Sequence, residues 1–68
     1  MSLFATLPTQ VSIERQIACV KREISKREHV YPRLVASDKM RPEKAAEEIE
    51  CMKAIQQTLE MVRDGNAS

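Results

Sequence analysis

The stretch IERQIACVKREI, residues 13–24, decides the fold class of this 68-residue chain. Its large aliphatic side chains recur at spacings of four, three and four residues, which places them on one side of an α-helix. Tyr31 and Leu34 continue this apolar side downstream. Ser12, just before the stretch, is a residue type that caps helix N-termini. We therefore predict a first helix over about 12–36.

Pro32 lies inside this predicted helix. Its ring removes one backbone donor and crowds the preceding turn, so the helix must either kink or break near it. Leu34 and Val35 keep the phase set upstream, which favours a kink near Pro32 over a break.

A second periodic segment follows the polar connector at 37–39. Pro42 suits the first position of a helix, although Arg41 before it is a poor cap. Gly65 suits a left-handed helix cap, so we predict a second helix over about 42–64. Its apolar stripe comprises Ala45, Ile49, Met52, either Ile55 or Gln56 beside it, Leu59 and Val62.

A connector this short makes the two helices antiparallel neighbours, so the predicted fold is an all-α antiparallel helical hairpin over 12–64. Two helices alone leave part of each apolar stripe uncovered, and chains below about 70–80 residues usually need reinforcement. A dimeric four-helix bundle is the simplest complete structure. Residues 1–11 read as an irregular arm, which either packs on the bundle or docks elsewhere, and 65–68 as a flexible tail.

The residue types argue against catalysis. A single glycine leaves no phosphate-binding loop, and His29 has no nucleophile motif around it. Cys19 and Cys51 form no CxxC pair and are expected about 10 Å apart along the hairpin, beyond the reach of a disulfide. We expect two free thiols, no metal site, no cofactor and no enzymatic activity.

The chain lacks the features of a secretory or membrane protein. Residues 1–8 have no basic region followed by a long apolar region, as a signal peptide would. No apolar run approaches the roughly 20 residues that span a bilayer. We expect a cytoplasmic protein that does not bind membranes.

Charge is unevenly distributed although the net charge is only +1. Residues 12–36 carry six basic and three acidic side chains, whereas 41–64 carry four basic and six acidic ones. On a helix, four basic residues fall on one line opposite the apolar side. This basic stripe consists of Arg15, Arg22, Lys26 and Arg33.

Two interpretations of the basic stripe stay open. It can bind a phosphate backbone or an acidic protein surface, or it can be solvated and pair with the acidic second helix. Only one Phe and one Tyr are present to stack on bases, and no helix-turn-helix spacing is found, which disfavours nucleic acid.

Four segments of the chain, 17–24, 27–35, 38–45 and 48–55, carry a resemblance. The distinctive elements are Val-Tyr-Pro-Arg at 30–33, Lys-Met in the turn, and Ala-x-x-Glu-Ile-x-x-Met at the start of the second helix. The chain resembles a group of short proteins encoded by tailed phages and prophages of proteobacteria. In those proteins Ser or Thr often stands where this chain has Arg41. The resemblance implies a phage or prophage origin and a helical hairpin. It does not assign an activity, because the group has none assigned.

The most distinctive cluster within this resemblance has two interpretations. Structurally, Pro32 sets a kink and the Tyr31 hydroxyl reaches the connector; functionally, Arg27 and Arg33 present a docking point. Together with the basic stripe, the candidate interaction residues are Arg15, Arg22, Lys26, Arg27, Tyr31 and Arg33.

We therefore expect a non-catalytic protein–protein interaction module that forms a homodimer and modulates a host or phage protein. The alternative is an accessory protein that binds nucleic acid through the basic stripe, followed by a structural subunit of a larger assembly.

Overall fold

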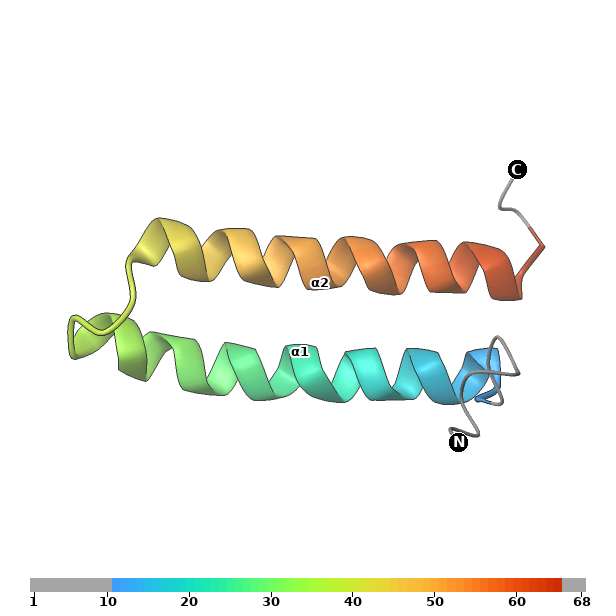
Figure 1. Ribbon diagram of the computed structural model, residues 1–68, viewed down its shortest axis with the longest axis horizontal. Helices are drawn as coiled ribbons and strands as arrows, with labels where there is room; N and C mark the ends of the chain where they lie inside the picture. The colour runs from blue at the N-terminus through green and yellow to red at the C-terminus, as the bar shows by residue number, and fades with distance from the viewer. Residues whose placement is uncertain (1–10, 66–68) are drawn as a thin grey trace, which may run out of the picture.

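The computed structural model describes residues 11–65 as two helices, α1 (Ile13–Ala36) and α2 (Pro42–Arg63). The helices run antiparallel side by side, joined at one end by the short connector (Figure 1). The prediction of an all-helical hairpin is confirmed. Of the expected arm at 1–11 only Val11 is described, and positions 1–10 and 66–68 lie outside the described residues.

Side-chain capping starts α1. Ser12 is the N-cap, and its hydroxyl oxygen accepts a hydrogen bond from the backbone N–H of Arg15 at 3.1 Å. Glu14 lies in the first turn, where the positive end of the helix dipole favours a carboxylate. The local sequence is therefore sufficient to begin the helix at this point.

Pro32 does not interrupt α1, which continues as one helix to Ala36. The side of the helix occupied by the Pro32 ring is exposed, so the ring displaces no packed neighbour. Proline has no N–H to donate to the carbonyl of Glu28, four residues back. A break is excluded, while the kink stays a prediction.

The end of α1 is a Schellman motif, a six-residue turn that satisfies the last helical carbonyls. The backbone N–H of Lys39 donates to the Leu34 carbonyl at 2.8 Å, and that of Asp38 donates to the Val35 carbonyl at 3.1 Å. Asp38 occupies the left-handed position, with φ of 63°. Glycine usually takes this position, and Asp is one of the few other residues that tolerate it. The connector therefore reverses the chain within five residues.

α2 begins without a side-chain cap. Arg41 stands at the N-cap position and makes no capping hydrogen bond, and Pro42 occupies the first helical position. At the other end, Asp64 is the C-cap and Gly65 follows with φ of +77°, the left-handed conformation expected for it. Proline and glycine set these two boundaries through backbone conformation alone.

The interface between the helices is thin. Ile17 and Ile24 of α1 are 5% and 6% exposed, and no residue of α2 is buried. The rest of the expected α1 side is half-buried, as are seven residues along α2: Ala45, Glu48, Ile49, Met52, Gln56, Leu59 and Glu60.

The residues of α2 that face α1 decide between Ile55 and Gln56 and correct the expectation for Val62. They include Gln56, while Ile55 is 43% exposed. Val62, which was expected on the apolar stripe, is 50% exposed, so that expectation was wrong. Ile55 stands about 100° around the helix from Gln56, which faces α1 more closely. The apolar stripe of α2 is therefore wider than α1 can cover.

Candidate functional site

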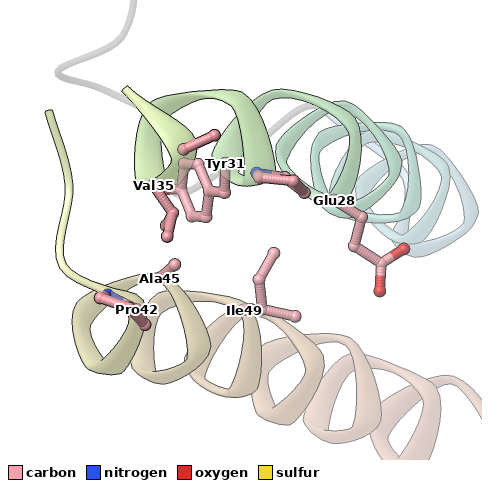
Figure 2. Close-up of a pocket in the computed structure, with 8 residues that line it drawn as sticks. Glu28, Tyr31, Val35, Pro42, Ala45 and Ile49 are labelled. Carbon is pink, nitrogen blue, oxygen red and sulfur yellow. The ribbon is translucent and has the colours of Figure 1, made fainter. Parts of the chain in front are cut away.

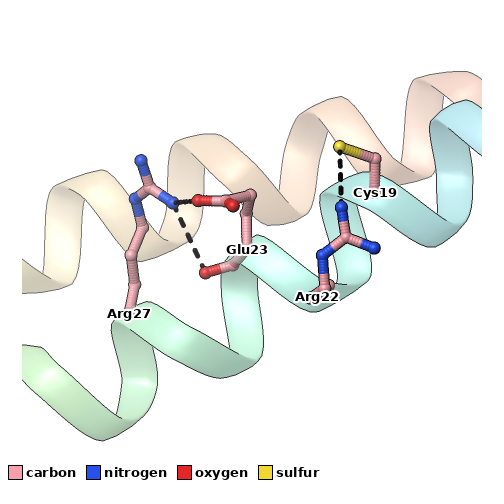
Figure 3. A network of polar contacts seen from close by, with 4 residues as sticks. All are labelled: Cys19, Arg22, Glu23 and Arg27. Atoms are coloured by element: carbon pink, nitrogen blue, oxygen red, sulfur yellow. Dashed lines mark hydrogen bonds and ion pairs between the residues drawn. The ribbon is translucent and has the colours of Figure 1, made fainter.

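The basic stripe forms on the outer side of α1. Arg15, Arg22, Lys26 and Arg33 are all exposed. Arg22 contacts the Cys19 sulfur at 3.7 Å, and the Arg33 guanidinium lies 3.4 Å from Nε2 of His29 (Figure 3 shows the Arg22 contact). Within residues 11–65, none of the four forms an ion pair.

The acidic residues of α2 do not neutralise this stripe. Among the described residues, one ion pair joins the helices, and its base comes from α2: Lys53 Nζ lies 3.2 Å from Glu28 Oε2. Lys44 pairs with Glu48 within α2 at 3.0 Å. The alternative in which the stripe pairs with the second helix therefore finds no support in the described part of the chain.

Arg27 lies apart from the basic stripe. Its guanidinium bends back along α1 onto the Glu23 carboxylate and the Glu23 carbonyl, and both side chains of the pair are about one third exposed (Figure 3). The hydrogen bond from Arg27 holds the pKa of Glu23 below its usual value. In turn Glu23, and after it the Tyr31 hydroxyl, raise the pKa of Arg27. Arg27 is therefore engaged within its own helix.

Tyr31 lines a groove between the helices near the connector. The groove has a volume of about 480 Å³ and is lined on α1 by Tyr31 and Val35 and on α2 by Pro42, Ala45 and Ile49 (Figure 2). Among residues 11–65, no hydrogen bond joins the Tyr31 hydroxyl to the connector, so the expected cap of the hairpin end is not formed there. The structure thus divides the predicted cluster: Arg27 and Tyr31 stay close to each other on the inner side of α1, whereas Arg33 points outward.

Sequence reasoning did not predict this groove. The available signal was the small side chain of Ala45 combined with proline on each helix, at Pro32 and Pro42. A small residue opposite an aromatic ring leaves space that no larger neighbour fills. Predicting the groove requires the register between the two helices. The spacing of apolar residues within either helix does not give that register.

The hairpin has two broad faces, one on each side of the plane that contains its two helices. The ion-pair face carries Glu28 and Lys53, and Glu28 also lies at the edge of the groove. Two residues further along each helix, about 200° around, stand Val30 and Ile55, which are 38% and 43% exposed. They define the opposite face, here called the Val30–Ile55 face.

The Val30–Ile55 face continues toward the open end of the hairpin. Val20 of α1 lines a hollow there together with Ile55 and Leu59 of α2. Val62, one heptad after Ile55, adds another exposed aliphatic side chain to the same side. Glu23 and Glu48, each one heptad before Val30 or Ile55, lie on the same face and pair there with Arg27 and Lys44. The face therefore combines exposed aliphatic side chains with two ion pairs.

The described residues present few groups for chemistry. Cys19 and Cys51 are both free and exposed, in agreement with the expected free thiols. Over positions 11–65, no three His, Cys, Asp or Glu side chains are arranged to hold a metal ion. Neither of the two described helices is long and apolar enough to cross a membrane.

Comparisons of the chain with protein-family models, with curated proteins and with solved structures yield no match.

Proposed function

We propose that the protein is a non-catalytic protein–protein interaction module that forms a dimeric four-helix bundle. The observation that carries this proposal is the thin core: two buried side chains in α1, none in α2, and large aliphatic side chains exposed on one face. Several large aliphatic side chains exposed on one face are typical of interaction sites. A second copy would bury it and supply the reinforcement that a small two-helix unit lacks.

The size of the face is sufficient for a stable dimer. Helices of 24 and 22 residues are about 35 Å long, and two side by side are about 20 Å wide. A face of this size covers about 700 Å² on each copy, or about 1,400 Å² in total, within the range of specific interfaces.

The test is the mass in solution. Sedimentation equilibrium at micromolar concentration should give about twice the 7.8 kDa of one chain. Ile55→Lys places a charge in the proposed interface and should shift the mass toward one chain. Gln57→Lys, exposed and about 200° around the same helix, is the matched control and should leave the dimer intact. A wild-type chain that stays monomeric would overturn the proposal.

The groove and the part of the basic stripe at Arg15, Arg22 and Lys26 are the surfaces such a dimer leaves for other partners. The resemblance to short phage and prophage proteins directs the search to host or phage proteins in the cytoplasm of a bacterium. A helix of a partner protein that displays acidic side chains would complement these three exposed basic residues.

One observation favours a second candidate function, an accessory role on nucleic acid. The four stripe residues are exposed and free of ion pairs within 11–65, and they extend over about 27 Å of one helix. Duplex DNA binding measured across salt should then show a steep salt dependence that disappears when all four become Gln. Absence of binding at low salt would exclude this function.

A further inference from the structure

Resting on the proposed dimer, we infer that a second copy covers the Val30–Ile55 face with its two-fold axis parallel to the helices. In this arrangement α1 of each copy packs on α2 of the other, and both connectors lie at the same end of the bundle. The alternative two-fold axis lies in the interface perpendicular to the helices. It packs α1 on α1 and α2 on α2, and it places the connectors at opposite ends.

The charges of the two helices decide between these arrangements. The outer side of α1, which borders the Val30–Ile55 face, carries the basic stripe, whereas the outer side of α2 carries Glu47 and Glu50. Packing α1 on α1 brings like charges together, and packing α1 on α2 brings opposite charges together. A second copy of this chain is therefore complementary to the first in one arrangement and repulsive in the other.

Arg33 and Glu47 mark the edges that meet in the favoured arrangement. Arg33 lies about 60° around α1 from Val30, and Glu47 about 80° around α2 from Ile55, so both flank the Val30–Ile55 face. The Lys53–Glu28 ion pair sets the register of the hairpin and places Glu47 level with about residue 34. A two-fold axis parallel to the helices leaves the position of each residue along the helix axis unchanged, so the same residues lie level in the two copies. Arg33 of one copy then lies beside Glu47 of the other.

The same two residues cannot meet within one chain. Arg33 stands about 180° around α1 from the buried Ile24, so it points away from α2. Glu47 stands about 200° around α2 from Ala45, which faces α1 across the groove. Any energetic coupling between Arg33 and Glu47 must therefore arise between two copies.

Charge reversal in separate chains tests this coupling. Arg33→Glu alone and Glu47→Arg alone should each raise the dimer Kd about 3- to 10-fold, because each homodimer contains two like-charge contacts. An equimolar mixture should associate with a Kd near that of the wild type, because both contacts are opposite in sign in the heterodimer. Lys21→Glu, an exposed change of equal charge on the side of Glu28, is the control and should not be rescued by Glu47→Arg. A mixture of Arg33→Glu and Glu47→Arg that associates no better than the separate variants would overturn the inference.

The position of the connectors gives an independent measurement. Lys39→Cys in a Cys19→Ser, Cys51→Ser background allows one spin label in each connector, and pulsed electron resonance reports the distance between two copies. Connectors at the same end should give a distance below about 25 Å, whereas opposite ends separate them by about 35 Å or more, the length of α1. The longer distance in a sample of dimer mass overturns this arrangement and leaves the proposed dimer in place. A monomer mass overturns both.

Discussion

α1 and α2 have nearly the same length, 24 and 22 residues, and yet they are stabilised in different ways. α1 has a side-chain N-cap at Ser12 and contributes both buried side chains, Ile17 and Ile24. α2 has no side-chain N-cap and no buried residue. α1 therefore supplies the buried side chains of the hairpin, and α2 packs against them. This difference indicates that α2 depends on contacts from outside the hairpin more than α1 does.

The largest expected effect comes from the buried part of α1. Ile24→Ala should lower the free energy of unfolding by on the order of 3 kcal/mol, because it removes buried methyl groups and leaves a cavity. Met61→Ala in α2, a position 43% exposed, should change it by less than about 0.5 kcal/mol. Urea unfolding followed by circular dichroism at 222 nm, at one protein concentration, compares the two. Equal losses would contradict the assignment of the core to α1.

The N-cap of α1 ranks next. Ser12→Ala should cost about 1 kcal/mol, because the N–H of Arg15 loses its acceptor. Ser25→Ala, exposed in the middle of the same helix, keeps the cap and should cost nothing. The midpoint of thermal unfolding distinguishes the two variants. If both lose the same stability, the capping hydrogen bond does not contribute.

The uncapped start of α2 offers the reverse change. Arg41→Ser should raise the stability by about 0.5–1 kcal/mol by supplying the missing cap acceptor. The change removes only an exposed Arg41–Glu43 contact of 3.8 Å, which contributes little. Arg41→Ala removes the same contact without adding a cap, so urea midpoints of the two variants isolate the cap. A gain in both would assign the effect to the lost arginine.

The smallest expected effect is the pH dependence of the Glu23–Arg27 pair. The pKa of Glu23 is lowered by its hydrogen bond with Arg27, so this carboxylate stabilises the fold above its unfolded pKa of about 4.3. The contribution is lost as the pH falls through the lowered folded pKa. Thermal unfolding should therefore find Glu23→Gln slightly less stable than wild type at pH 7 and equal to it near pH 2. A difference that persists in acid would assign it to packing.

Part of the candidate site followed from the sequence because it lies on one helix. The stripe of Arg15, Arg22, Lys26 and Arg33 needs only the helical period, and these residues are exposed along α1. Arg27 is one position after Lys26 and about 100° around the helix, where Glu23 one turn earlier engages it. Predicting the groove at Tyr31 would have required knowing that Ala45 of α2 lies opposite it. The apolar spacing within α1 gives no information about that alignment.

The sequence by itself determined the features that arise from local interactions: two helices, their caps and the connector that reverses the chain. Each depends on residues within about five positions, such as the hydroxyl of Ser12 or the backbone freedom of Gly65. Only the tertiary structure decided which part of each apolar stripe is covered, because rotation of a helix about its axis is set by packing against its neighbour. That rotation places Gln56 toward α1 and leaves Ile55 exposed, and it creates the face on which the proposed dimer depends.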